Sequence, residues 1–107
     1  MSMGLIAGAG TVLYNSNGWY VCTNGVIVSI TVRVKTDSGS WASRACPYML
    51  PESLRPKTTF QAPVATANGG SITGVMFANT DGTITVANQG GSGSDGLRMG
   101  SLSYVVV

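Results

Sequence analysis

The sequence predicts an all-β domain, a small antiparallel β-barrel or sandwich of seven to eight short strands. Apolar and polar residues alternate with a period of two along much of the chain, and no window of about a dozen residues keeps a helical stripe. Clusters of Gly, Pro, Asn and Asp interrupt these runs at the spacing typical of strands joined by turns. The length of 107 residues is that of one domain.

The clearest predicted element is a hairpin in the first third of the chain. Two β-rich runs, residues 19–23 and 26–34, flank Asn24-Gly25, and both turn residues tolerate the positive φ of a type I′ turn. The apolar face of the second run consists of Val26, Val28, Ile30, Val32 and Val34. Its other face carries Ser, Thr, Arg and Lys beside one Ile, which predicts a sheet with one side on the core and one in water.

The middle of the chain is less regular. Residues 37–39, Asp-Ser-Gly, predict a turn, and residues 41–48 form a weaker strand candidate. Two prolines within residues 50–56 rule out a central strand, so we expect an ordered loop there. Residues 58–66 resume the strand pattern with Pro63 inside it, which predicts an edge strand or a bulge.

The last third predicts a second hairpin and a closing strand. Residues 71–79 and 83–87 flank Asp81-Gly82, and the Gly-rich segment 89–96 precedes a final strand over residues 97–107. The chain ends in Tyr-Val-Val-Val, where most chains turn polar. Such a tail is stable only when it is buried in the sheet or against a partner subunit, so we expect association. We place the barrel at residues 12–107 and interpret the uncharged residues 1–11 as a connecting or swapped segment.

The composition excludes several classes of function. The formal net charge is only +2 and contains no basic run, so we expect no nucleic-acid partner. The chain has no His, which removes the usual proton shuttle and the commonest zinc ligand. The apolar stretch over residues 4–13 is too short to span a bilayer of about 30 Å, so we expect no membrane insertion.

No catalytic or metal-binding pattern is present in the sequence. A glycosidase needs a pair of carboxylates, but Asp37 and Asp81 belong to turns, and Glu52 and Asp95 stand in loops without a local pattern. The cysteines and acids do not have the spacing of metal ligands. We therefore expect no enzymatic activity, no catalytic residue, no metal and no cofactor.

Several motifs occur in a distinctive order between residues 12 and 107. They are the Asn-Gly hairpin into a long Val/Ile-rich strand, the Leu-Pro…Leu-Arg-Pro loop at residues 50–56, Ser-Ile-Thr-Gly-Val at 71–75, Asp-Gly-Thr-Ile-Thr-Val at 81–86 and Ser-Leu-Ser-Tyr at 101–104. In this order they resemble the C-terminal head domain of tail-fibre and baseplate receptor-binding proteins from phages of Gram-positive bacteria. Family heads usually end in Ser-Tyr-Pro, and Val105 replaces that proline here.

The resemblance implies a trimeric Greek-key or jelly-roll-like barrel at the distal tip of a fibre. Such a head binds a cell-surface polysaccharide or teichoic-acid-like glycan without cutting it, and it works at the virion tail tip after assembly in the bacterial cytoplasm. Because that cytoplasm is reducing, we expect Cys22 and Cys46 to be free, buried thiols.

The family's binding residues vary, so the site residues are chosen here on physical grounds. A saccharide site combines a flat apolar face with a few well-placed polar groups. The candidates are the pairs Trp41 with Arg44 and Asp95 with Arg98, and the tyrosines Tyr20 and Tyr48. Trp41 has an alternative interpretation as a core residue that plugs the end of the barrel.

Two other functions fit the same sequence. One is a purely structural trimerisation or capping module of a fibre. The other is a complement-type trimeric jelly-roll binding module, which would share the fold but not the Leu-Pro…Arg-Pro loop. Binding to glycans or whole cells would separate recognition from a structural role.

Overall fold

The computed structural model describes residues 10–36, 43–66, 72–88 and 97–106. Within these ranges the chain forms eight strands and one short 3-10 helix, which confirms the all-β prediction. The elements are β1 (Thr11–Ser16), β2 (Trp19–Thr23), β3 (Ile27–Lys35), β4 (Ser43–Ala45), η1 (Glu52–Leu54), β5 (Phe60–Thr66), β6 (Ile72–Ala78), β7 (Ile84–Asn88) and β8 (Leu97–Val105).

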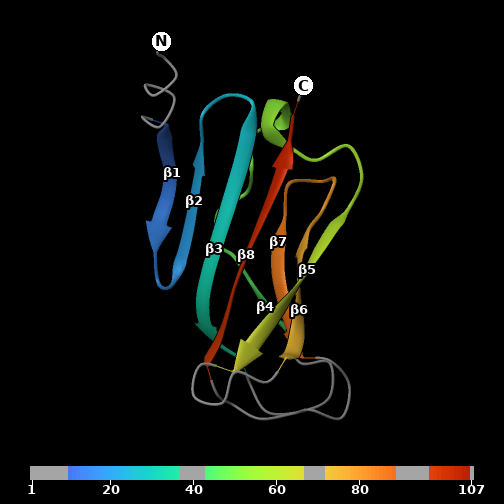
Figure 1. The fold of residues 1–107 in the computed structure, drawn as a ribbon. Helices are drawn as coiled ribbons and strands as arrows, with labels where there is room; N and C mark the ends of the chain where they lie inside the picture. The colour runs from blue at the N-terminus through green and yellow to red at the C-terminus, as the bar shows by residue number, and fades with distance from the viewer. Residues whose placement is uncertain (1–9, 37–42, 67–71, 89–96, 107) are drawn as a thin grey trace.

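All eight strands belong to one antiparallel sheet that curls into a half-barrel (Figure 1). The strand order is β1-β2-β3-β8-β5-β6-β7-β4, so β3 and β8, far apart in the sequence, pair along their whole length. The two edge strands are β1 and β4. On the inner side, Tyr14 of β1 stacks on Tyr48, which follows β4, with ring centroids 5.4 Å apart. This contact ties the two edges of the curled sheet together.

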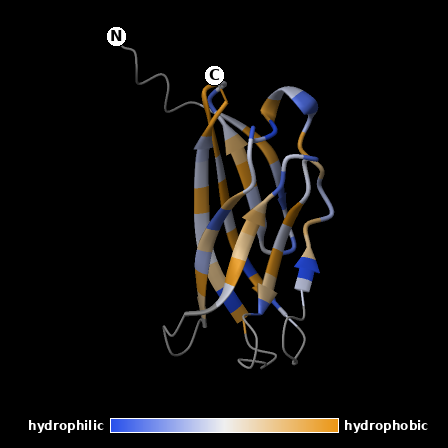
Figure 2. Ribbon diagram, turned by 90° about the vertical axis from the view of Figure 1, so that its right-hand side faces the viewer, coloured by the Kyte–Doolittle hydropathy of each residue, from blue (hydrophilic) through white to orange (hydrophobic). Residues whose placement is uncertain are grey.

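The predicted alternation of buried and exposed residues in β3 is confirmed. Val28, Ile30, Val32 and Val34 are buried, and the residues between them are half-buried or exposed. Figure 2 shows the same alternation of apolar and polar positions along the strands. Val26, which we also expected on the apolar face, lies before the strand and is 46% exposed. The core on the inner side consists of Trp19, Val21, Val28, Ile30, Val32, Val34, Cys46, Leu50, Val64, Met76, Ala78, Ile84, Val86, Leu102 and Tyr104.

The turn between β2 and β3 differs from the predicted type I′ turn. Only Gly25 has a positive φ, of 93°, and the loop has three residues because β3 begins at Ile27. The side chain of Asn24 explains the difference. Its Oδ1 accepts hydrogen bonds from the backbone N–H groups of Val26 and Ile27, both at 2.9 Å, which makes an Asx turn.

The two-residue turn with positive φ at both positions is instead at Asn17-Gly18, between β1 and β2. The φ values are 52° and 88°, as a type I′ turn requires. Gly18 also packs tightly, because a Cβ there would collide with the carbonyl oxygen of Arg33. The N–H of Arg33 donates to the carbonyl of Gly18 at 2.8 Å. This hairpin therefore rests on the end of β3.

The segment over residues 50–56 is an ordered loop, as predicted, and contains η1. Arg55 donates from Nε to the carbonyl of Leu50 at 2.9 Å, and the Tyr104 hydroxyl donates to the carbonyl of Leu54 at 2.6 Å. These two bonds fix the loop over the upper end of the sheet.

The strand with Pro63, β5, shows the predicted irregularity. It pairs with β6 along its length, with a register shift at Val64/Ala65. It pairs with β8 only at Ala65 and Thr66, so Pro63 needs no ladder hydrogen bond on that side. The described part of the weaker strand candidate at residues 41–48 contains β4, and the predicted turn at 37–39 lies outside the described residues.

Candidate functional site

The outer side of β1, β2, β3 and β8 carries no charged side chain above Arg33 of β3. Partners in an antiparallel pair share one face of a sheet, so the register defines this surface. We call it the uncharged face. It consists of Val12, Asn15, Tyr20, Cys22, Ile27, Ser29, Thr31, Ser101, Ser103 and Val105.

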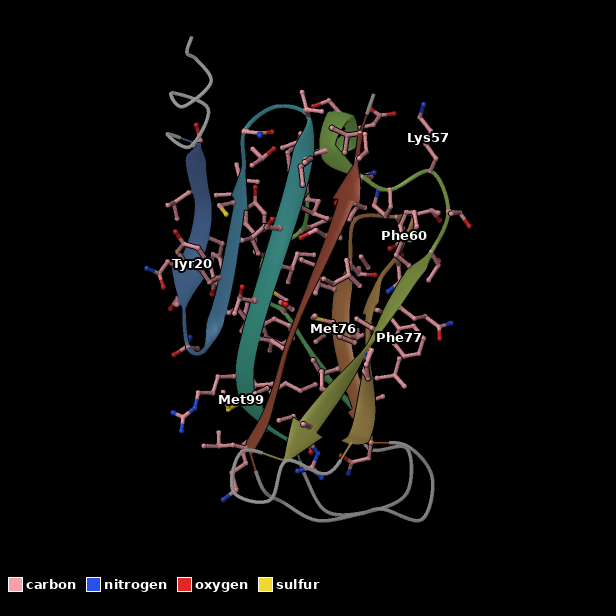
Figure 3. The ribbon with its side chains drawn as sticks, viewed as in Figure 1. Tyr20, Lys57, Phe60, Met76, Phe77 and Met99 are labelled. Atoms are coloured by element: carbon pink, nitrogen blue, oxygen red, sulfur yellow. The ribbon has the colours of Figure 1, made fainter. Side chains whose placement is uncertain are left out.

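A shallow hollow of about 310 Å³ lies on this face. Its lining residues are Gly10, Val12, Tyr20, Cys22, Thr23, Asn24, Ile27 and Ser29. Tyr20 is 38% exposed and supplies an aromatic ring with a hydroxyl (Figure 3). We call this the Tyr20 hollow. Its chemistry is a ring, two aliphatic side chains, a thiol, hydroxyls and an amide.

Hydrogen bonds hold the polar groups of the Tyr20 hollow in place. Thr23 donates from its hydroxyl to the carbonyl of Ile27 at 2.9 Å, and Ser29 shares a hydrogen bond of 3.1 Å with Ser103 across β3 and β8. Asn24 uses Oδ1 in the turn, so its side chain is anchored there. A ligand would therefore meet preformed donors and acceptors, which is typical of small-molecule sites.

The second hollow, of about 480 Å³, lies at the lower end of β3 beside β4. Its lining residues are Asn17, Trp19, Arg33, Val34, Lys35, Arg44, Ala45, Pro47 and Leu97. Arg44 donates from Nε to the carbonyl of Lys35 at 2.6 Å, which holds the arginine across from β4 to β3. We call this the basic hollow, because Arg33, Lys35 and Arg44 line it together.

Arg98, which we expected at the surface beside Asp95, is fully buried. It occupies the inner side of β8, as Leu102 and Tyr104 do. There it donates from Nη2 to Asn88 Oδ1 at 3.1 Å, and Thr36 donates from its hydroxyl to the same oxygen at 2.8 Å. This buried network joins the ends of β3, β7 and β8, so Arg98 does not present its guanidinium to a ligand on the surface.

The other predicted site residues are spread over the molecule. Tyr20 lies in its hollow on the outer side, and Arg44 lies in the basic hollow. Tyr48 is half-buried and stacked on Tyr14, so one face of its ring is already covered. Trp41 and Asp95 lie outside the described residues.

The sequence did not predict the residues that line the Tyr20 hollow together with Tyr20. It also did not predict that Arg33 and Lys35 line the basic hollow together with Arg44. The alternation of β3 contained the signal, because it placed Ser29, Thr31, Arg33 and Lys35 together on the wet side. What could not be anticipated was the partner strand, since the β1–β2 hairpin was not predicted.

Both cysteines are free thiols, as expected. Cys46 is buried, and burial raises the pKa of its thiol above the usual value, an effect larger than the opposing backbone hydrogen bond of Tyr48. Cys22 is only half-buried and lines the Tyr20 hollow, which corrects the expectation that both thiols are buried.

Among the residues with assigned positions, no three His, Cys, Asp or Glu side chains come close enough to hold a metal ion. The same part of the chain contains no helix long and apolar enough to cross a membrane. No family model matches the sequence, and no curated protein matches it.

Proposed function

We propose that this chain is a non-enzymatic recognition head that binds a cell-surface saccharide, at the tip of a phage or phage-like fibre. The observation that carries the proposal is the Tyr20 hollow, which is shallow, uncharged and lined by one ring among fixed hydroxyl groups. The order of motifs along the chain, which resembles phage receptor-binding heads, adds to it.

The chemistry of the hollow suits a sugar. A pyranose has an apolar face of C–H groups and a rim of hydroxyls. The Tyr20 ring can cover such a face and keep its own hydroxyl in water. Ser29, Thr23 and Asn24 surround the ring with groups that pair with sugar hydroxyls. A rigid sheet with its polar groups tied to the backbone loses little entropy on binding.

A single site of this size binds weakly. One covered ring and a few neutral hydrogen bonds of about 1 kcal/mol each amount to an affinity near millimolar. A homotrimeric head would present three such sites to one cell surface, and avidity would then raise the overall affinity by roughly a hundredfold or more. We therefore include the trimer in the proposal.

The test is binding of the chain to an array of bacterial cell-wall glycans and to whole cells. Tyr20→Ala should reduce binding at least about tenfold, whereas Tyr20→Phe, which keeps the ring, should retain most of it. Both variants should keep the thermal midpoint of the parent chain, because Tyr20 lies on the exposed side of β2. Equal binding by Tyr20→Ala and the parent chain would contradict the proposal.

The second candidate is a purely structural trimerisation module. The observation in its favour is a group of exposed aliphatic side chains at the upper end, Val26, Ile27 and Val105, with exposures of 46%, 39% and 54%. This candidate predicts assembly without glycan binding. A chain that forms trimers but binds no glycan and no cell would favour it over the recognition head.

A further inference from the structure

Two Asn-Gly pairs have a similar sequence context but different surroundings in the fold. Asn17-Gly18 joins β1 to β2, and Asn24-Gly25 lies between β2 and β3 (Figure 1). Each pair follows a hydroxyl residue, all four residues are exposed, and the two glycines have similar φ values, 88° and 93°. A third pair, at residues 68–69, lies outside the described residues. The first two pairs therefore show how the fold alone changes the chemistry of this dipeptide.

An asparagine before a glycine can react with its own backbone. The glycine nitrogen attacks Cγ of the asparagine, which closes a five-membered succinimide ring, and the side-chain nitrogen leaves as ammonia together with the proton of the attacking nitrogen. Water then opens the ring at one of its two carbonyls and leaves aspartate or isoaspartate. Glycine favours the reaction because it has no side chain to crowd the attacking nitrogen. The sum consumes one water, releases one ammonia and needs no enzyme, oxidant or metal.

At Asn24 the fold holds both reacting groups. Oδ1 of the side chain accepts hydrogen bonds from the N–H groups of Val26 and Ile27, both at 2.9 Å, so the carboxamide is fixed in the Asx turn. The N–H of Gly25, the group that would attack, donates to the Thr23 hydroxyl at 3.0 Å. Ring closure at this position therefore requires that these hydrogen bonds break first.

At Asn17 neither reacting group is held. Among the described residues, the Asn17 carboxamide and the N–H of Gly18 have no hydrogen-bond partner. The Gly18 carbonyl accepts from the N–H of Arg33 at 2.8 Å, so the attacking nitrogen belongs to an anchored residue while the carboxamide next to it can rotate. Asn17 also lines the basic hollow, where water reaches its side chain. Ring closure here breaks no hydrogen bond of either reacting group.

We propose that Asn17 is a site of spontaneous covalent modification, at which ring closure by the Gly18 nitrogen converts the asparagine to aspartate and isoaspartate. Asn24, with the same following residue, is protected by its turn. The reaction needs no ligand, so it is independent of the recognition role proposed above. Both products replace a neutral amide with a carboxylate, which lowers the formal net charge of +2 by one.

The isoaspartate product also alters the hairpin that carries Tyr20. Isoaspartate adds one carbon to the backbone of a two-residue turn. The turn has no room to adjust at Gly18, where even a Cβ would collide with the Arg33 carbonyl. We expect the tip of the hairpin to move off β3 and to lose its bond to Arg33. Because β1 and β2 supply half of the residues that line the Tyr20 hollow, the modification also changes that hollow.

The experiment follows both sites while the folded chain is incubated at neutral and mildly alkaline pH. Chymotrypsin cleaves after Trp19 and Tyr20, which separates the two sites into different peptides, and mass spectrometry measures the replacement of NH2 by OH in each. We expect Asn17 to react at least about tenfold faster than Asn24, the factor that one or two hydrogen bonds supply. In concentrated urea the two rates should become similar, because only the fold distinguishes the sites.

Two variants test the mechanism. Asn17→Gly keeps the left-handed backbone of the type I′ turn and removes the carboxamide, so it should keep its thermal midpoint during the incubation. The isoaspartate fraction of the parent chain, separated by ion exchange and reversed-phase chromatography, should have a lower midpoint. Thr23→Val removes the acceptor of the Gly25 N–H and should raise the rate at Asn24 several-fold while the rate at Asn17 stays the same.

Three outcomes would overturn the inference. Equal rates at the two sites in the folded chain, or a faster reaction at Asn24, would show that the hydrogen bonds do not control the reaction. An unmodified Asn17 after the urea-unfolded chain has reacted there would show that the anchored turn prevents ring closure. An isoaspartate form with the thermal midpoint of the parent chain would refute the movement of the hairpin.

Discussion

Tyr104 shows how burial of one polar residue makes stability depend on pH. Its ring is buried, stacks on Phe60 with centroids 5.8 Å apart, and its hydroxyl donates to the carbonyl of Leu54 at 2.6 Å. Burial raises the pKa of Tyr104 to about 12. The neutral phenol is therefore the form that the folded state retains.

The sign of the pH dependence follows from this shift. In the unfolded chain the phenol titrates near pH 10, below its pKa in the folded state, so the stabilisation is fully present below about pH 10 and is lost as the pH rises toward 12. We expect a loss on the order of 2 kcal/mol over that interval. Urea denaturation at several pH values between about 9 and about 12 measures this loss.

Tyr104→Phe is the matched variant for this measurement. It keeps the ring but removes the bond to Leu54, so it should cost about 1 kcal/mol at neutral pH and flatten the decline above pH 10. An unchanged slope in this variant would mean that other groups cause the alkaline loss.

At single positions, the sequence predicted side-chain environments only where the strand pattern was unbroken. Tyr20 follows Trp19 in a strand, so one of the two had to face outward, and Tyr20 does. Arg98 was expected at the surface because it adjoins a Gly-rich loop. Its even-numbered position, shared with Leu102 and Tyr104, indicates the inner side instead, and the burial follows from it.

At the scale of the element, the β1–β2 hairpin depends on a glycine, Gly18, that no residue with a side chain can replace. Gly18 has a φ of 88°, and a Cβ would collide with the Arg33 carbonyl. Gly25 has a similar φ of 93°, but a Cβ there would meet nothing within 4 Å. The pair therefore separates backbone strain from steric contact.

We expect Gly25→Ala to cost about 1 kcal/mol, the strain of a left-handed residue alone, and Gly18→Ala to cost at least about 2 kcal/mol more. Chemical denaturation of the two variants measures both values. Similar losses in the two variants would show that the hairpin shifts away from β3 without penalty.

The hairpins also show which parts of the sheet were predictable. β3, β6, β7 and β8 follow from alternation and from the turn residues next to them. β1 was not predicted because it ends in two polar residues, Asn15 and Ser16, before the Asn17-Gly18 turn. The strand therefore lacks a strong apolar face in the sequence. The turn type at Asn24 was mistaken because side-chain capping by Asn competes with the left-handed backbone that Asn-Gly favours.

At the scale of the molecule, the topology could not be read from the sequence. The chain goes from β3 to the far edge of the sheet at β4, and β8 then returns to fill the place beside β3. Local patterns predict strands and hairpins, but the pairing of β3 with β8 depends on contacts between residues more than sixty positions apart, such as Ile30 with Leu102. This pairing brings the C-terminal strand onto the uncharged face.

Where β8 pairs with the start of β3, exposed aliphatic side chains form an apolar group at the upper end of the uncharged face. Val105 pairs with Ile27, and the N–H of Val106 donates to the carbonyl of Val26 at 2.8 Å, so the aliphatic side chains of three residues lie together on the surface. Exposed groups of this kind mark contacts with other chains. In the proposed trimer, this group lies in the subunit contact and the Tyr20 hollow beside it.

Val105→Asp tests this arrangement, and Met99→Asp is its control. Both residues lie on the outer side of β8, with exposures of 54% and 43%, but Met99 lies toward the lower end (Figure 3). Light scattering at micromolar concentration should give three times the mass of one chain for the parent and for Met99→Asp. Val105→Asp should give the mass of one chain, because an aspartate from each subunit would be desolvated in the contact.

Since avidity requires three sites, adsorption of Val105→Asp to cells should fall by roughly a hundredfold while its single-site affinity for glycan stays the same. A monomeric parent chain would refute the trimer, and a trimeric Val105→Asp would move the subunit contact to another surface.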